Sequence, residues 1–378
     1  MIANNIHTTE EKAIDYISNL IKNRDYDSLF YTDGATEKLR NLTNAQNILL
    51  TSSCTHALEM TALLLDLKQG DEVIMPSFTF VSTANAYVLR GATPVFVDIR
   101  EDTLNIDEKL VEAAITENTK AIVAVHYAAI ACDMLKLKKI AKKYGLALIE
   151  DAAQCIDSYY HGQHLGTFGD FGTLSFHYTK NITSGFGGAL IINNDKYLEK
   201  SKIFWQKGTN REAFLGGQAD KYTWVDVGSS YMMSELNAAL LFAELEDVKN
   251  ITQKRLEVWN QYFDAFKNTQ YGFRLPIVPD GCKHNGHIFY LLASSAYKKN
   301  QLIQQFKKRG LDAKFHYQPL HLSEKGIVFS KTNSNLMITE KLANLLVRLP
   351  IPGNISSINF ADLLRNVYEL TPATGIPI

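Results

Sequence analysis

The chain has 378 residues, a formal net charge of −1 at pH 7, 46% hydrophobic residues and 21% charged residues. That length accommodates a sizeable core, and we expect two unequal domains. The near-neutral charge provides no electrostatic footprint for a nucleic acid or an anionic membrane, so neither is expected as a partner.

The first residues of the chain carry no sign of export, and its cysteines carry no sign of a metal site. Residues 1–5 (Met-Ile-Ala-Asn-Asn) have neither the basic nor the apolar region of a signal peptide. No apolar run approaches the ~18 residues that cross a bilayer. Zinc and redox sites need closely spaced cysteines, and the four here are far apart: Cys54, Cys132, Cys155 and Cys282. We therefore expect a reduced, cytoplasmic enzyme without a metal.

Short apolar runs alternate with helical patterns from residue 47 to residue 194. Helices with 3.6-residue periodicity are expected at 57–67 and 134–144, and turns at Gly70, Gly91 and Gly145. The expected strands cover residues 47–51, 72–75, 94–99, 121–127, 146–150, 173–176 and 189–192. Buried strands that alternate with helices predict an α/β fold with a mostly parallel central sheet, covered on both faces.

The pattern changes after residue 232. A long helix is expected over 234–266, then a strand over 286–295 and helices over 300–309 and 339–347. We expect residues 1–245 to form a large domain and residues 246–378 a smaller α+β domain, to which an N-terminal helix over 10–22 could add.

Ligands of open parallel sheets bind at the carboxyl ends of the strands, so chemistry is expected directly after each strand. Residues 51–57 (Thr-Ser-Ser-Cys-Thr-His-Ala) follow the first strand and open a helix. Their backbone N–H groups at a helix N-terminus could hold a phosphate. The same residues would also serve as an ordinary N-cap, because Ser and Thr are preferred there.

Two further strand ends carry a carboxylate and an amine. Asp151 ends a buried strand, where it could anchor a protonated pyridine nitrogen or cap the next helix. Lys180 follows a later strand and could form a Schiff base, although most lysines are surface residues. A phosphate seat, an acid and a lysine in this order are what a type I fold for pyridoxal phosphate (PLP) requires. GxGxxG after the first strand and a Walker lysine are both missing, which excludes the dinucleotide and P-loop alternatives.

Four linked motifs resemble the DegT/DnrJ/EryC1/StrS family of sugar aminotransferases, over about residues 51–350. They are residues 53–59, 70–80, 150–154 (Glu-Asp-Ala-Ala-Gln) and 175–180 (Ser-Phe-His-Tyr-Thr-Lys). Residues 53–55, 125–127, 207–211 and 226–231 are most similar to the branch that aminates dTDP-4-keto-6-deoxy-D-glucose at C4. The resemblance implies a PLP-dependent transferase of fold type I, with L-glutamate as donor. Its product would be a dTDP-4-amino-4,6-dideoxy sugar for surface polysaccharides such as enterobacterial common antigen, O-antigen and lipopolysaccharide.

The resemblance also implies cofactor contacts. Lys180 would carry PLP as a Schiff base and move protons, and Asp151 would pair with the pyridine nitrogen. Ser230 would reach the phosphate from a second subunit, so a homodimer with shared active sites is implied. The other implied contacts are Gln154 at the phenolic oxygen, Phe80 on the ring face, and Cys54, Thr55 and Ser175 at the phosphate.

Substrate contacts are less defined, because surface or core roles explain the same residues equally well. Cationic and donor groups are what a sugar diphosphate requires. The candidates are His126, Lys207, Asn210, Arg211, Lys221 and His316.

Three features depart from the family pattern. Phe186 replaces a usual glutamate, Ala129 replaces a usual glycine, and the segment 34–51 is shorter and has Ala35 in place of an aromatic residue. Amination at C3 and a non-catalytic relative that binds nucleotide sugars or regulates therefore stay open as alternatives. A PLP-dependent sugar dehydratase is disfavoured by Lys180, because those relatives typically carry histidine at this position.

Overall fold

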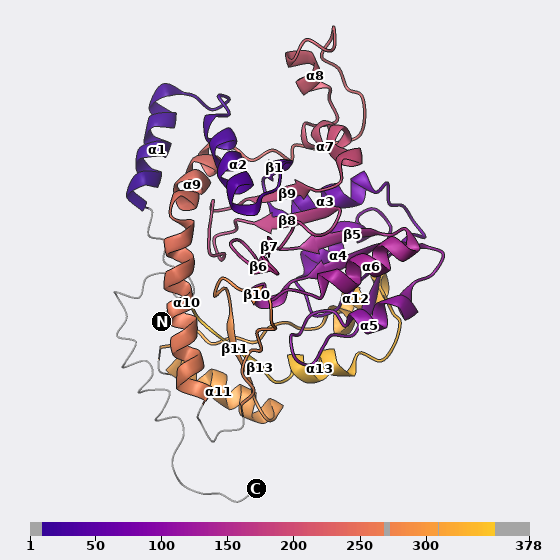
Figure 1. Cartoon of the computed structure of the whole chain (residues 1–378), viewed down its shortest axis with the longest axis vertical. Helices are drawn as coiled ribbons and strands as arrows, with labels where there is room; N and C mark the ends of the chain where they lie inside the picture. Colours follow the sequence, from indigo (N-terminus) through magenta and orange to yellow (C-terminus); the bar gives the residue numbers. More distant parts are fainter. Residues whose placement is uncertain (1–9, 268–272, 309, 352–378) are drawn as a thin grey trace, which may run out of the picture.

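The computed structural model describes residues 10–267, 273–308 and 310–351. Its centre is an eight-stranded sheet in the order β1-β9-β8-β5-β4-β2-β3-β12 (Figure 1). Only β9 runs antiparallel to its neighbours, β1 and β8, so the mostly parallel α/β sheet is confirmed. The strands are β1 (Ile48–Thr51), β2 (Glu72–Pro76), β3 (Thr93–Val97), β4 (Thr119–Val125), β5 (Ala147–Asp151), β8 (Phe171–Ser175), β9 (Gly188–Ile192) and β12 (Lys331–Thr332).

Both faces of this sheet are buried, because successive side chains of a strand point to opposite sides. In β4, Ile122 and Ala124 pack into one core and Ala121 and Val123 into the other. Helices of the first face are α2 (Phe30–Thr43), α5 (Glu108–Val111), α6 (Met134–Tyr144) and α9 (Glu235–Glu246). Helices of the second face are α3 (Cys54–Leu64), α4 (Val81–Val88) and α7 (Leu198–Trp205).

A second, smaller hydrophobic core lies below the main sheet in Figure 1. Strand β11 (Phe289–Leu292) pairs antiparallel with β13 (Leu346–Leu349), and α10 (Val248–Lys267) and α11 (Ala296–Lys308) pack on them. Helix α1 (Glu10–Asn23) lies against α9, where Lys12 and Tyr16 both reach Glu246, at 3.2 and 3.1 Å. The domain boundary at residue 245 stays a prediction.

Most predicted elements are shifted by one to four residues at their ends, and three differ in kind, continuity or length. The prediction of a helix over 339–347 was wrong at its C-terminal end. Helix α13 covers Met337–Ala343, and the chain then enters β13. The apolar residues of β13 are buried by pairing with β11, a tertiary contact that local periodicity does not encode. The helix expected over 234–266 is interrupted at Asp247, and the strand expected over 286–295 is limited to β11.

Short elements complete the described chain. A small antiparallel sheet has the order β10-β6-β7, and α12 (Glu324–Phe329) leads to β12. Its strands are β6 (Tyr159–Tyr160), β7 (Gln163–His164) and β10 (Cys282–Lys283). Across residues 10–267, 273–308 and 310–351, none of the helices combines the length and apolar character needed to cross a bilayer.

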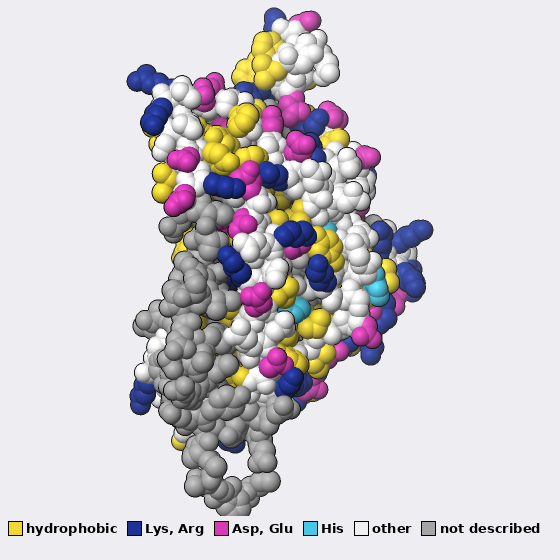
Figure 2. Space-filling model, turned by 60° about the vertical axis from the view of Figure 1, so that its left-hand side comes forward, with side chains coloured by type: hydrophobic (Ala, Val, Ile, Leu, Met, Phe, Trp, Pro, Cys, Tyr) yellow, Lys and Arg dark blue, Asp and Glu magenta, His cyan; other side chains and the backbone are white. Residues whose placement is uncertain are grey.

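An arm formed by residues 206–230, which includes α8 (Arg211–Leu215), projects from the top of the body (Figures 1 and 2). Backbone hydrogen bonds such as Val225 N–H to Gly208 O, at 2.8 Å, hold its two sides together. Apolar side chains on the arm are exposed, including Leu215, Tyr222 and Trp224, which is 78% exposed. An exposed apolar group of this kind is typical of an interaction surface.

Candidate active site

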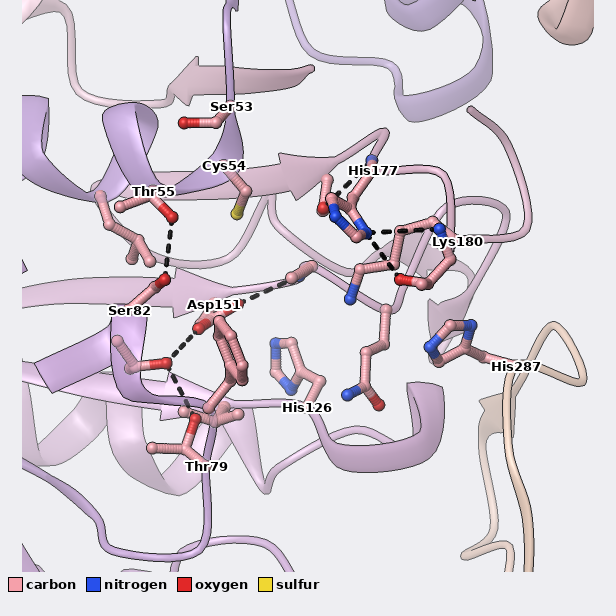
Figure 3. Close-up of a pocket in the computed structure, with 18 of the residues that line it drawn as sticks. Ser53, Cys54, Thr55, Thr79, Ser82, His126, Asp151, His177, Lys180 and His287 are labelled. Atoms are coloured by element: carbon pink, nitrogen blue, oxygen red, sulfur yellow. Dashed lines mark hydrogen bonds between the residues drawn. The ribbon is translucent and has the colours of Figure 1, made fainter. Parts of the chain in front are cut away.

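A cavity of about 380 Å³ opens where β5 and β8 end, between the main sheet and the β11–β13 sheet. This is the edge of a parallel sheet where ligands are expected, and the volume suits a small organic ligand. Figure 3 shows Cys54 and Thr55 at the upper left of this cavity, Asp151 below them and Lys180 to the right. The predicted site residues that line it are Cys54, Thr55, Phe80, His126, Asp151, Gln154, Ser175, Lys180 and His316.

The N-terminus of α3 forms one end of the cavity. Ser53 is its N-cap, and its hydroxyl accepts the His56 N–H at 3.1 Å. The amides of Cys54 and Thr55 are the first two of the helix and have no acceptor within it. Together with the helix dipole, they favour an anion at this point. The same segment can thus serve as N-cap and as phosphate site, because the Ser53 hydroxyl caps the helix while the Cys54 and Thr55 amides stay available for an anion.

Gly188 of β9 passes directly beneath this helix end. A Cβ atom at this position would lie 2.3 Å from the Cys54 nitrogen and 2.5 Å from the Ser53 carbonyl carbon. Both atoms belong to backbone, which cannot move aside as a flexible side chain can. Only glycine therefore allows β9 and the helix end to approach so closely.

We expect Gly188→Ala to lower the free energy of unfolding by about 1–3 kcal/mol, the usual range for overpacking, and to weaken phosphate-ester binding at the α3 end. Urea unfolding and a PLP binding titration measure the two effects. Gly216→Ala is the control, because its Cβ would meet its nearest atom, the Glu212 carbonyl oxygen, at 3.2 Å. Equal behaviour of the two variants would contradict the close approach.

Asp151 is buried at the end of β5, and its carboxylate is held on both oxygens. Thr83 donates its hydroxyl to Asp151 Oδ2 at 2.6 Å, and the Ala153 N–H donates to Oδ1 at 3.2 Å. The Thr83 hydroxyl is itself 2.8 Å from that of Thr79. Because a carboxylate accepts about four hydrogen bonds, Asp151 keeps capacity for a cationic ligand in the cavity.

Lys180 lies in the turn after β8, and its side chain lines the same cavity as Asp151. Burial lowers the pKa of the Lys180 amine, and the charge of Arg348 lowers it further, whereas Cys54 and Asp151 act in the opposite direction. A neutral amine is a nucleophile, so this environment suits covalent chemistry at Lys180.

The lowered pKa gives a pH prediction. The rate at which the protein forms a reducible bond with added pyridoxal should rise with pH and reach half its maximum below 10.5, the ordinary lysine value. Since the unfolded chain keeps this proton longer than the native state, Lys180 also makes stability rise with pH between the two pKa values. Borohydride trapping and mass spectrometry follow the first effect. A half-maximum at or above 10.5 would contradict the burial argument.

Two more predicted contacts lie at the cavity wall. Phe80 precedes α4 and is 59% exposed, so its ring is presented to the cavity instead of packing in the core. Gln154 accepts the Ala128 N–H at 2.7 Å and donates to the Tyr317 hydroxyl at 3.2 Å. Ala128 and Ala129 both have positive φ, 56° and 63°. Ala129 thus keeps the left-handed turn for which a glycine would be favoured.

His126 lies at the cavity wall, but both of its ring nitrogens are already bonded. Nδ1 accepts the Cys132 N–H at 3.1 Å, so the ring proton is on Nε2, which lies 3.0 Å from Glu150. Glu150 also accepts the N–H groups of Gly166, Phe168 and Gly169. This network accounts for His126 as a buried residue that pairs with Glu150, the carboxylate that holds the loop after β7.

The remaining candidates lie on the arm and do not line the cavity of their own chain. Asn210 uses its amide within the arm, where it donates to Lys221 O at 2.9 Å and accepts the Thr223 N–H at 2.8 Å. Lys207 and Arg211 line a separate surface pocket, together with Gln206 and Glu235. The candidates on the arm are Lys207, Asn210, Arg211, Lys221 and Ser230.

Several cavity residues were not predicted from the sequence. Thr83 lies in the helix that follows the residue 70–80 motif, so its place near the strand ends could have been inferred. His287, Tyr317 and Arg348 come from the smaller sheet and the loops around it, more than 100 residues beyond Lys180. No local pattern marks them, because docking of the two sheets brings them to the cavity.

These features fit one cofactor class. A seat for an anion, a carboxylate with capacity for a cation, an amine of lowered pKa and an exposed ring surround a cavity of suitable size. PLP offers the matching groups: a phosphate, a protonated pyridine nitrogen, an aldehyde and a flat ring. The fold and site thus define a PLP-dependent enzyme of fold type I.

Comparison with known proteins identifies the family. A model of the DegT/DnrJ/EryC1/StrS aminotransferase family matches residues 7–367, and the chain belongs to this family. The uncharacterized protein MJ1066 of Methanocaldococcus jannaschii is 35% identical over 292 residues, which are 76% of this chain and 75% of that protein. The predicted family, enzyme class and cofactor are confirmed: the protein is a PLP-dependent sugar aminotransferase.

Solved structures support the fold. Helicobacter pylori PseC, an aminotransferase involved in the biosynthesis of pseudoaminic acid, superposes with a TM-score of 0.88 and 25% identity over 98% of each chain. Spr1654 of Streptococcus pneumoniae, in its PLP-form, gives a TM-score of 0.88 at 22% identity, over 98% of this chain and 99% of that one.

Proposed function

We propose that the enzyme transfers the amino group of L-glutamate to C4 of dTDP-4-keto-6-deoxy-D-glucose, giving a dTDP-4-amino-4,6-dideoxy sugar for surface polysaccharide. The observation that carries the proposal is the convergence of Lys180, Asp151 and the α3 N-terminus on one cavity. The choice of sugar rests on the resemblance of residues 53–55, 125–127, 207–211 and 226–231. A cytoplasmic location is part of this proposal, and the four cysteines, which form no disulfide, are compatible with it.

In this proposal each side chain has a defined task. The α3 amides, with Thr55 and Ser175, bind the cofactor's phosphate, and Asp151 holds its pyridine nitrogen in the charged form. PLP, when bound, supplies the electron sink for amine transfer. Lys180 Nζ takes and returns the proton that moves during the transfer, because a neutral amine of lowered pKa can act in both directions. Phe80 covers one face of the ring, and Gln154 donates toward its phenolic oxygen.

The arm supports a homodimer with shared active sites. Ser230, Lys207 and Arg211 lie away from the cavity of their own chain, and the arm exposes Leu215, Tyr222 and Trp224. A second copy would bury these apolar groups and bring the arm's donors to the neighbouring cavity. Sedimentation of the wild-type protein and of Trp224→Lys tests this: the dimer should dissociate in the variant.

The deciding assay offers dTDP-4-keto-6-deoxy-D-glucose and L-glutamate to the purified enzyme, with NMR of the product. Amine at C4 is the expected result, and amine at C3 would move the enzyme to the other regiochemical class. If the protein binds the sugar nucleotide but the visible absorbance of its cofactor does not fall when glutamate is added, the non-catalytic alternative is supported instead.

A further inference from the structure

A guanidinium group forms part of the cavity wall opposite the main sheet. Arg348 belongs to β13, and it lines the cavity together with Lys180, Lys314 and His316. Lys314 is paired with Asp312 at 2.7 Å. In the described ranges, which end at residue 351, no carboxylate lies within ion-pair distance of Arg348.

Arg348 is fixed in position from two sides. Its backbone N–H donates to Lys314 O at 2.7 Å, and the Lys314 N–H returns a bond to Arg348 O at 3.0 Å. Its Nη1 lies 3.2 Å from His316 Nε2. Since a guanidinium can only donate, Nε2 accepts, and the ring proton of His316 is on Nδ1, 3.3 Å from the Tyr127 hydroxyl.

His316 is suited to hold the guanidinium without neutralising it. Its ring stacks on Tyr317 at 4.0 Å between centroids. Burial, with the charges of Arg348 and Lys180, keeps the pKa of His316 well below its ordinary value, so the ring is neutral. His316 therefore holds the Arg348 guanidinium in position, and the guanidinium keeps its positive charge.

One donor of this guanidinium is left unused. Arg348 Nε is buried and finds no hydrogen-bond acceptor among the described residues. Burial also lowers the pKa of Arg348, a sign of the cost of holding this charge away from water. Leaving a buried donor unpaired is unfavourable, and an acceptor arriving with a ligand would relieve that cost. A carboxylate accepts two parallel N–H bonds from a guanidinium.

We propose that Arg348, positioned by His316, binds the α-carboxylate of the amino donor and so makes the enzyme select amino acids over simple amines. This inference rests on the proposed transaminase function. The α-carboxylate is bonded to the same carbon as the reacting amine, so the residue that binds it must lie beside Lys180. Arg348 meets this condition, because it lines the same cavity as Lys180. Its positive charge also contributes to the lowered pKa of the Lys180 amine. The diphosphate of the sugar nucleotide is attached at C1, across the sugar ring from C4.

Binding of glutarate, a dicarboxylate without an amino group, tests the site on the cofactor-loaded enzyme by calorimetry. Arg348→Gln should weaken glutarate binding about 10- to 100-fold, the effect of losing a charge-assisted bond. Arg348→Lys keeps the charge but loses the two parallel N–H donors, so its glutarate affinity should lie between those of Arg348→Gln and the wild type. Arg90→Gln, an exposed arginine outside the cavity, is the control and should bind as the wild type does. Circular dichroism verifies that each variant is folded.

The two half-reactions locate the carboxylate. In single-turnover experiments, Arg348→Gln should slow amine uptake from L-glutamate at least about tenfold, and amine delivery to the keto-sugar less than about threefold. Equal loss in both halves, or loss only in the sugar half, would overturn the inference in favour of a diphosphate contact. Unchanged glutarate affinity would also overturn it. If the wild type binds glutarate through Arg348 but aminates no keto-sugar, the proposed function fails and this inference stands.

Discussion

Replacing Lys180 with alanine is expected to reduce amine transfer by roughly 10⁴-fold, since one side chain provides both the nucleophile and the proton carrier. Its amine lines the cavity at the end of β8, and burial lowers its pKa. The variant should also yield no peptide labelled with the cofactor after borohydride reduction. Single-turnover absorbance and peptide mass spectrometry measure the two effects.

Lys142→Ala is the matched control for this experiment. Lys142 is exposed on α6, which packs on the opposite face of the sheet from α3. This control should retain both activity and labelling. Turnover of Lys180→Ala within about tenfold of the wild type would exclude Lys180 as the reacting amine.

Asp151→Asn should lower the rate of amine transfer by about 10²- to 10⁴-fold, because removing one partner of a buried charge pair costs about 3–5 kcal/mol. The amide keeps the size of the carboxylate and can still accept the Thr83 hydroxyl, so the change removes charge more than shape. The cofactor's ring nitrogen would then lose the group that keeps it protonated.

The control for Asp151→Asn is Asp264→Asn, an exposed aspartate of α10 that pairs with Lys267. Equilibrium binding of PLP to both variants separates weaker cofactor binding from slower chemistry. If Asp151→Asn bound PLP normally and turned over at the wild-type rate, Asp151 would be a structural cap for the segment after β5 and nothing more.

Local patterns were sufficient for the part of the site that lies on the main sheet. Strand, turn and helix succeed one another there within a few residues, so the positions of Cys54, Asp151 and Lys180 at strand ends follow from periodicity alone. The sheet is mostly parallel as expected, and β9 is the antiparallel strand that brings Gly188 beneath α3.

The other wall of the cavity could not be predicted in this way. Arg348 directly follows the stretch 339–347, whose apolar spacing indicated a helix, and only the pairing of residues 346–349 with β11 makes this region a strand. His126 is a residue type that can bind a substrate, but its two ring nitrogens are bonded to Glu150 and to the Cys132 N–H. These contacts are set by tertiary packing. The arm's donors depend on a second chain, which no single sequence pattern describes.

The adjacent acids Glu150 and Asp151 show how much depends on one strand's alignment. Neighbouring residues of a strand face opposite sides, so Glu150 is turned to His126 and three loop amides while Asp151 is turned to Thr83 and the cavity. Parallel pairing with β4 and with β8 fixes that alignment from both edges. A slip of β5 by a single residue would exchange the two carboxylates. An insertion or deletion of one residue that shifts Glu150 and Asp151 along β5 should therefore silence the enzyme even where the chain still folds.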